Sequence, residues 1–246
     1  MDFFKEQPEL ISIFYMYLPT LKQIIKFYTS NKYFYKYYNK ELFENYFFRP
    51  NKPQLYNAVD EWYENRKEAI KKYGDISTWN IQDIKDIREL FEFKKKFNDD
   101  IGDWNTSNVK YMNYTFYECN IFNKSIENWN TSNVVDMANM FECASCFNQP
   151  LNKWDVSNVK KIYKIFLQAY KFNQPLNNWN TKNIVNMSFA FYEAFMFNQS
   201  ISDWDVKSVI FNNQMFEGAY SFNHRKLNIW HIKCCYNWRI TIRLFI

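Results

Sequence analysis

The sequence predicts an α+β repeat solenoid, a stack of 25-residue units preceded by a helical N-terminal module. Two sets of residues recur every 25 residues. The first is a series of tryptophans, at Trp79, Trp104, Trp129, Trp154, Trp179 and Trp204. The second is a series of Phe-Asn pairs, which begin at Phe97, Phe122, Phe147, Phe172, Phe197 and Phe222. A fixed period of roughly 20–50 residues is the signature of stacked repeats.

Composition and charge narrow the class of protein. The chain has 246 residues and is 22% aromatic, which excludes disorder through lack of apolar surface. The repeats, residues 97–227, carry 11 Lys and Arg against 12 Asp and Glu. A nucleic-acid binder concentrates basic groups on one face, so we expect no nucleic-acid partner.

Residues 1–50 predict a helical module outside the repeat. Leu21, Ile24, Ile25 and Tyr28 share one face of a helix that begins near Pro19. A second helical pattern runs over residues 34–47. Two prolines in residues 49–53 cannot continue a helix and mark a domain boundary.

The rest of the chain divides at changes of pattern. Residues 51–72 predict a linker helix with Trp62, Ala69 and Ile70 among Glu and Lys. The repeats occupy residues 73–227, first in degraded form and then in five better copies. Residues 228–246 are expected to be a C-terminal cap or tail, with three basic residues and no acid.

One repeat predicts a short strand, a turn and a short helix. In the copy that opens at Phe122, the helix is expected from Met137, Met140, Phe141 and Ala144, which have helical spacing. Such a unit is too small to bury its apolar face alone, so neighbours must stack like upon like. The Asn after each Phe is expected to form a ladder that satisfies backbone groups.

Two patterns suggest chemistry only weakly. Cys143-x-x-Cys146 has the spacing of a zinc or redox pair, but a four-ligand site needs two more donors, so small apolar residues in a reducing compartment are the favoured interpretation. Acidic residues recur near the ends of the copies, at Glu118, Glu142, Glu193 and Glu217, and Leu167 takes the place of the acidic residue in the copy between Glu142 and Glu193. We interpret these glutamates as a solvent-exposed helix face.

The whole pattern, Phe-Asn-Gln-Pro-Leu-x-x-Trp-(Asn/Asp)-x-Ser-Asn-Val-x-x-Met-x-x-Met-Phe-x-x-Ala, closely resembles the BspA-like leucine-rich-repeat family, also called DUF285, over residues 73–227. Ile162 and Asn212 stand where other copies have Met. The resemblance implies a leucine-rich-repeat-like solenoid that binds proteins and has no catalytic residues. Members occur on bacterial surfaces, in protists and in large DNA viruses.

A looser resemblance covers residues 18–47. Leu18-Pro19, then Ile24-Ile25 and an aromatic after a polar turn are similar to an F-box, which implies docking onto a Skp1-type adaptor of a ubiquitin ligase. The alternative is an aromatic helical cap that shields the first repeat, as terminal repeats require. The sequence leaves both open.

Function is therefore expected to be non-catalytic protein binding, with no cofactor and no metal. Candidate partner-binding positions are Leu18, Pro19, Ile24 and Ile25, and the residue after each repeated Val or Ile, namely Lys110, Val135, Lys160, Val185 and Ile210. A ubiquitin-ligase adaptor and a structural protein of a large DNA virus particle are the alternatives. The N-terminus lacks the features of a signal peptide and no apolar run reaches membrane length, so we expect an intracellular protein.

Overall fold

The computed structural model describes residues 48–223. The chain divides into two compact units, residues 1–81 and residues 82–246. The predicted positions Leu18, Pro19, Ile24 and Ile25 lie outside the described residues, so the choice between a docking module and a cap stays a prediction.

The described part of the first unit holds two helices, α5 (Lys52–Glu64) and α6 (Arg66–Tyr73), and a single 3-10 turn, η1 (Ile76–Thr78). Helix α5 begins with a capping box. The Asn51 side chain accepts from the Gln54 backbone N–H at 3.0 Å, and the Gln54 side chain accepts from the Asn51 N–H at 2.9 Å. These two bonds satisfy donors that a helix start leaves unpaired.

The single linker helix predicted over residues 51–72 is wrong, because Asn65 interrupts it with φ −141° and ψ 69°. Trp62 and Ala69 are buried as expected. Ile70 is 45% exposed, since α6 does not continue the apolar face of α5. Trp62 packs edge-on against Trp79 with ring centroids 5.8 Å apart, which forms the centre of this unit's described core.

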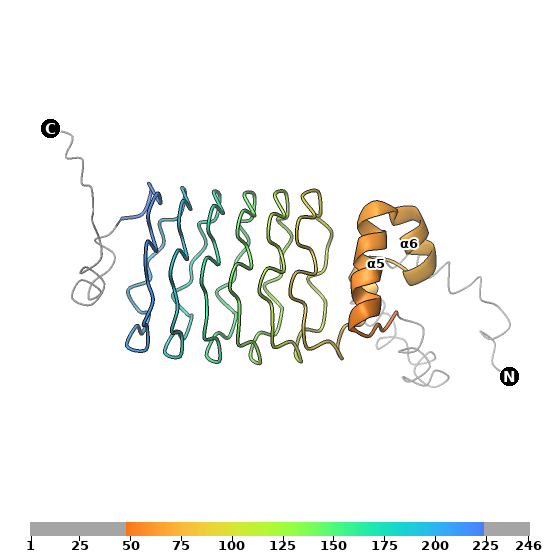
Figure 1. The fold of residues 1–246 in the computed structure, drawn as a ribbon, viewed down its shortest axis with the longest axis horizontal. Helices are drawn as coiled ribbons and strands as arrows, with labels where there is room; N and C mark the ends of the chain where they lie inside the picture. The colour runs from red at the N-terminus through yellow and green to blue at the C-terminus, as the bar shows by residue number, and fades with distance from the viewer. Residues whose placement is uncertain (1–47, 224–246) are drawn as a thin grey trace, which may run out of the picture. The chain divides into compact units, whose positions relative to one another are not determined.

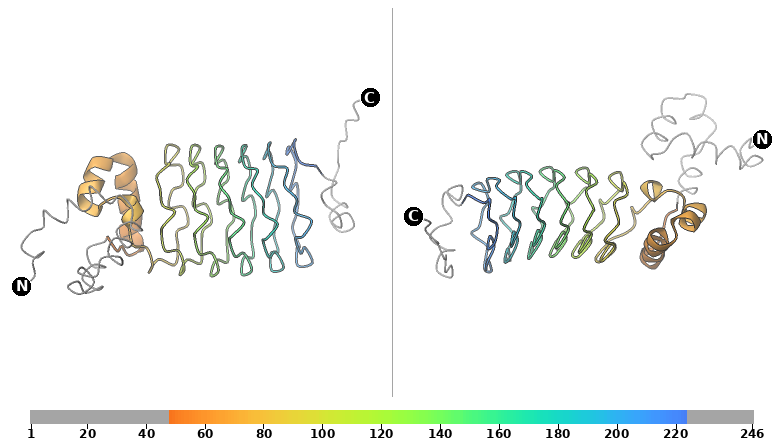
Figure 2. Two further views of the ribbon diagram at one scale, coloured as in Figure 1. Left: turned by 180° about the vertical axis from the view of Figure 1, so that it is seen from behind. Right: turned by 90° about the horizontal axis from the view of Figure 1, so that it is seen from above.

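The second unit is a stack of coils, each 25 residues long (Figure 1). Each coil begins at a Phe-Asn pair: residues 97–121, 122–146, 147–171, 172–196 and 197–221. The coils lie side by side in sequence order in each view of Figure 2. Over residues 82–223 the structure has no helix, and its only strand-like pairings are five isolated parallel bridges, Asp86–Tyr111, Tyr111–Asp136, Asp136–Lys161, Lys161–Asn186 and Asn186–Phe211.

The short helix expected at Met137, Met140, Phe141 and Ala144 is wrong. These four residues are buried, but they belong to two consecutive four-residue turns. The N–H of Phe141 donates to the carbonyl of Ile165 in the next coil (2.9 Å), whereas a helix would direct it four residues back. Alternate N–H groups close turns within a coil, and those between them bond to the next coil.

Left-handed backbone makes these turns possible. The third residue of each turn has a positive φ, for example 60° at Asn139 and 60° at Cys143. Two turns of this kind bring the same positions inward as a helix does, at i, i+3, i+4 and i+7. The apolar spacing alone therefore cannot separate the two structures.

The core contains three aromatic ladders together with buried Ile, Leu, Val and Met side chains, and the prediction of Phe over Phe and Trp over Trp is confirmed. Phe116 stacks on Phe141 with centroids 5.5 Å apart, and Phe122 stacks on Phe147 at 5.8 Å. Trp129 stacks on Trp154 at 6.5 Å with the rings 2° from parallel. These rings are buried, and each added coil extends the same apolar core.

The predicted asparagine ladder is also confirmed. The side-chain oxygen of each Asn accepts from the backbone N–H of the Asn one coil later, at 2.9 Å between Asn123 and Asn148 and between Asn148 and Asn173. A second set of asparagines bonds backwards: the Asn158 amide donates to the Ser132 carbonyl at 2.7 Å. Identical residues 25 positions apart thus satisfy polar groups by hydrogen bonds, in addition to packing the apolar core.

Candidate protein-interaction surface

The five predicted surface positions of the repeats form one row, which we call the bridge row. From the second member on, the N–H of each residue donates to the carbonyl of the member before it at 2.9 Å, through the series Lys110, Val135, Lys160, Val185 and Ile210. Both lysines are exposed and both valines are half-buried, while Ile210 is 71% exposed. The sequence placed these residues together correctly, since parallel pairing at a 25-residue step aligns them.

The residues that follow the bridge row add charge and an aromatic ring. The Arg88 guanidinium pairs with the Asp86 carboxylate at 2.7 Å and lies 5.2 Å from the centroid of the Tyr111 ring. Lys161 Nζ lies 3.5 Å from an oxygen of Asp136. The contacts of Arg88 with Tyr111 and of Lys161 with Asp136 join neighbouring coils on the surface.

A second surface, which we call the turn face, is formed by the six turn segments, residues 88–93, 113–118, 138–143, 163–168, 188–193 and 213–218. The third and fourth residue of each segment point into the core, as Thr115 and Phe116 do. The first, second, fifth and sixth residues carry the outer side chains. Arg88 belongs to this face and contacts Tyr111, so the turn face adjoins the bridge row.

Aromatic side chains cover much of the turn face. Phe93 is 55% exposed and packs edge-on against half-buried Tyr117, with centroids 5.1 Å apart. Tyr163 packs edge-on against Phe189 at 5.9 Å, again across two coils. Tyr and Phe change place from coil to coil, so the repeated positions of the sequence do not reveal this surface. The signal that could have found it is the number of aromatic residues at the outer positions of each turn.

The acidic residues of the turn face are not one solvated helix row, as the sequence suggested. Glu118 and Glu193 occupy the sixth position of their turn segments, whereas Glu142 and Glu217 occupy the fifth. Glu142 is only 8% exposed. It accepts a hydrogen bond from the Asn139 amide, and its carboxylate lies 3.6 Å from Lys164 Nζ. Glu142 is thus a buried, paired group.

A hydrogen-bonded chain crosses three coils on this face. The Cys143 thiol donates to the side-chain oxygen of Gln168 at 3.2 Å, and the Gln168 amide donates to Glu193 at 2.9 Å. Burial, with Glu142 and Glu118 nearby, raises the pKa of Cys143 to about 11. Burial also raises the pKa of Cys119 far above its usual range. Both thiols are protonated at neutral pH, whereas a nucleophilic cysteine needs a lowered pKa.

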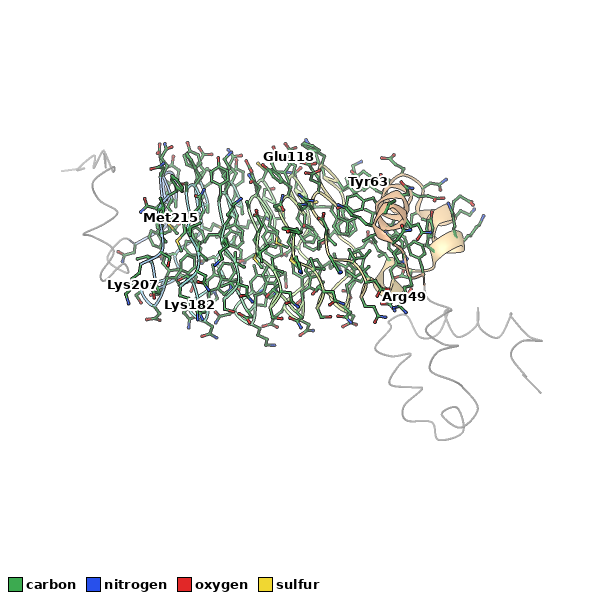
Figure 3. All side chains as sticks on the ribbon, turned by 60° about the horizontal axis from the view of Figure 1, so that its bottom comes forward. Arg49, Tyr63, Glu118, Lys182, Lys207 and Met215 are labelled. Atoms are coloured by element: carbon green, nitrogen blue, oxygen red, sulfur yellow. The ribbon has the colours of Figure 1, made fainter. Side chains whose placement is uncertain are left out.

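The turn face carries negative charge in excess. Its six segments hold six glutamates, and only Arg88 and Lys164 are basic. Burial together with neighbouring Glu89 raises the pKa of Glu92. The labelled Glu118 lies on one side of the coils in Figure 3, and the labelled Lys182 and Lys207 lie on the opposite side. Charge is therefore distributed unevenly around the coils.

An aromatic ladder runs along the last three coils. Tyr170 stacks on Phe195 at 4.6 Å, and Phe195 stacks on Tyr220 at 5.3 Å. Phe195 is 36% exposed, Met196 54% and Tyr220 83%. The same positions hold Asn120 and Ser145 in earlier coils, so this apolar corner belongs to the C-terminal coils.

Metal-ligand chemistry has no candidate in the described residues, since residues 48–223 contain no group of three or more His, Cys, Asp or Glu side chains able to hold an ion. Cys143 and Cys146 are free, half-buried thiols. In the same part of the chain, no helix is both long and apolar enough to cross a membrane.

Comparison with known proteins gave one family. The family model described as "Mycoplasma protein of unknown function, DUF285" matches residues 57–176 and again residues 149–240, so the matches together cover well over half of the chain. Neither the curated proteins nor the solved structures gave a match. The resemblance to DUF285 seen in the repeats is confirmed: this chain belongs to the DUF285 family.

Proposed function

We propose that this protein is a non-catalytic binding module, a leucine-rich-repeat-like solenoid that docks a protein partner on its turn face. The proposal rests on one observation: on the turn face the backbone hydrogen bonds repeat from coil to coil, whereas the outer side chains vary. The first five turn segments keep the same hydrogen bonds to the next coil, while the outer side chains differ from coil to coil. Such a surface is rigid in shape and variable in chemistry.

The kinds of side chain support protein binding. Half-buried tyrosines such as Tyr117, Tyr163 and Tyr192 offer a large contact area and lose little conformational entropy on binding. Aromatic residues are enriched where proteins meet. The T-shaped contacts of Tyr117 with Phe93 and of Tyr163 with Phe189 hold these rings before a partner arrives.

The charge of the turn face indicates the chemistry of the partner. Glutamates such as Glu118 and Glu193, set among tyrosines, favour a partner surface that presents Lys or Arg, because a cation there meets both carboxylates and aromatic rings. The bridge row adjoins this face and would extend the contact. Association should therefore weaken as salt rises.

Photo-crosslinking tests the proposal without a known partner. A benzophenone amino acid replaces Tyr117 or Tyr192 in the full chain, and in a control it replaces Lys182, which is exposed on the opposite side. After irradiation in an extract of the native source, the products are identified by mass spectrometry. We expect one discrete protein product from the two tyrosine positions, with a yield that falls as salt is raised.

The control defines the opposite outcome. Equal products from Lys182 and from the tyrosine positions would show that the turn face is not special, and the proposal would fail. A glutamine pair, Glu118→Gln with Glu193→Gln, should lower the yield at Tyr192 while changing the melting temperature little, since glutamine keeps an oxygen that accepts from Gln168 and the ion pair of Glu118 with exposed Lys95 contributes little.

The F-box-like adaptor remains a second candidate, supported only by the sequence of residues 18–47. A pull-down with a Skp1-type protein tests it. Recovery by the wild type, and its loss in Leu18→Ala with Ile24→Ala, would support docking by this segment. No recovery by the wild type would remove this candidate and leave the turn-face proposal intact.

A further inference from the structure

Exposed apolar side chains gather along one corner of the last three coils, which we call the apolar corner. It consists of Tyr170, Phe195, Met196 and Tyr220. Phe195 stacks on Tyr170 at 4.6 Å and on Tyr220 at 5.3 Å. Tyr220 is 83% exposed and Met196 54%, so much of this group faces solvent. Apolar side chains that are grouped on a protein surface mark an interaction site more often than scattered ones do.

A carboxylate is held in place beside the apolar corner. The Gln168 amide donates to Glu193 at 2.9 Å, and a Cβ atom on Gly218 would lie only 2.7 Å from Cγ of Glu193. Glu193 is therefore held between Gln168 of the preceding coil and the backbone of Gly218 in the next coil. Burial raises the pKa of Tyr170, and the charge of nearby Glu193 acts in the same direction. The carboxylate thus lies close to a ring of the corner.

Elsewhere on the solenoid, the chain places its own cations between a tyrosine ring and a carboxylate. Lys164 Nζ lies 5.4 Å from the centroid of the Tyr163 ring and 3.6 Å from an oxygen of Glu142. Arg88 has the same arrangement, 5.2 Å from the centroid of Tyr111 and paired with an aspartate. An aromatic ring and a carboxylate together attract a cation more strongly than either group alone.

The apolar corner offers the same two groups to a cation from outside. Glu193 and Glu217 each accept from the amide of a neutral glutamine, at 2.9 Å and 2.6 Å, and within residues 48–223 neither pairs with a lysine or arginine. Lys171 follows Tyr170 at the N-terminal end of the corner. The cation of a partner therefore fits best on the two later coils, beside the two glutamates.

The spacing of the corner favours a helix over a strand as the bound element. Its successive rings lie 4.6 Å and 5.3 Å apart. Residues three and four apart in a helix rise by roughly 4.5–6 Å along its axis, so a helix that lies along the stack presents one side chain to each coil. Side chains on one face of a strand repeat at roughly 6.6 Å, which does not match the rings.

We propose that the apolar corner docks a basic amphipathic helix of a partner protein. The apolar stripe of this helix lies along Tyr170, Phe195 and Tyr220, and an arginine or lysine beside the stripe meets Glu193 and Glu217. The inference rests on the proposed function as a protein-binding module. It adds an anchoring surface that lies outside the six turn segments.

A defined helix tests this docking without the natural partner. The probe is a fluorescein-labelled, lactam-stapled peptide of about 16 residues, long enough to form a stable helix once it is stapled. Leucines at i, i+3 and i+7 form its apolar stripe, and arginines flank them. Control peptides carry glutamate in place of arginine, or serine in place of leucine. Fluorescence anisotropy measures binding to the full-length protein.

We expect the basic helix to bind at least about tenfold more tightly than the acidic helix, because the corner is bordered by carboxylates. Tyr220→Ser should weaken binding roughly fivefold or more. Ile210→Ser is the matched control, since Ile210 belongs to the same coil and is 71% exposed but lies on the bridge row. It should change binding by less than about twofold. Melting temperatures of both variants check that the fold is retained.

Equal affinity for the basic and the acidic helix, or equal effects of Tyr220→Ser and Ile210→Ser, would overturn the inference. Absence of binding by the wild type would overturn it too. A concentration-dependent dimer, or adsorption to phosphatidylcholine vesicles, that Tyr220→Ser abolishes would assign the corner to a different occupant and reject the helix. Photo-crosslinking at Tyr117 does not involve the corner, so failure of helix docking and failure of the turn-face proposal are distinguishable.

Discussion

The indole N–H of Trp154 donates to the carbonyl oxygen of Ile126, 28 residues earlier, at 3.0 Å. The same bond joins Trp129 to Ile101 at 2.9 Å and Trp179 to Leu151 at 3.0 Å. Each tryptophan therefore performs two tasks, since its ring stacks in the core and its N–H satisfies a buried carbonyl of the preceding coil. Phenylalanine could perform only the first.

Trp154→Phe should lower the free energy of unfolding by about 1–3 kcal/mol, the cost of losing a buried hydrogen bond. Trp154→Ala should cost about 3–5 kcal/mol, because a cavity is added. Urea denaturation measures both. The control is Lys153→Ala, since Lys153 is exposed and its ion pair with Glu127, 3.2 Å long, should contribute less than about 1 kcal/mol. Equal losses for all three variants would contradict the role of the indole bond.

The sequence predicted the parts of the fold that depend on the same residue type recurring every 25 residues. Phe147, Trp154 and Asn148 recur in copy after copy, and stacking of like on like followed directly. It did not predict the turns over residues 137–144. Their apolar spacing is also that of a helix, and the left-handed residues there, Asn139 and Cys143, are not glycines. The backbone conformation of these turns is set by hydrogen bonds to the next coil, and the local sequence pattern does not reveal those bonds.

Glu118 has φ 54°, and the equivalent residue in the fifth coil is Gly218 with φ 74°. Glu118→Val should lower the free energy of unfolding by about 1–2 kcal/mol, since a branched side chain is strained in the left-handed region. Glu118→Gly should be close to neutral. As a control, Lys110→Val places the same residue where Val135 and Val185 already lie, and thermal unfolding should change little. An equal loss for Val at both positions would contradict the assigned backbone.

Burial raises the pKa of Tyr117 from 10.0 to about 12 in the folded protein, and Glu142 and Glu118 act in the same direction. The neutral phenol is thus favoured by folding. Its contribution to stability is fully present below pH 10 and is lost as pH rises from 10 towards 12. Urea denaturation at increasing pH should show the wild type losing stability relative to Tyr117→Phe over this window. A difference that does not change with pH would contradict the burial of this group.

The candidate site was only partly visible in the sequence. The bridge row, from Lys110 to Ile210, was found because its members follow a repeated apolar residue. The turn face was missed because its aromatics occupy different outer positions, as Tyr117 and Phe189 do, and because Glu118 and Glu142 were assigned to one row. Which side chains share a face depends on the four-residue turns, and a helix would have grouped them differently.

Deletion of one whole period tests the coil register most directly. Removal of residues 147–171 joins Cys146 to Phe172 and restores every ladder, whereas removal of residues 147–158 joins Cys146 to Val159 and breaks them. Near-ultraviolet circular dichroism of the stacked tryptophans, followed through thermal unfolding, compares the two. We expect a cooperative transition at a lower melting temperature for the 25-residue deletion and loss of the signal for the 12-residue deletion. Equal loss of signal in both proteins would contradict it.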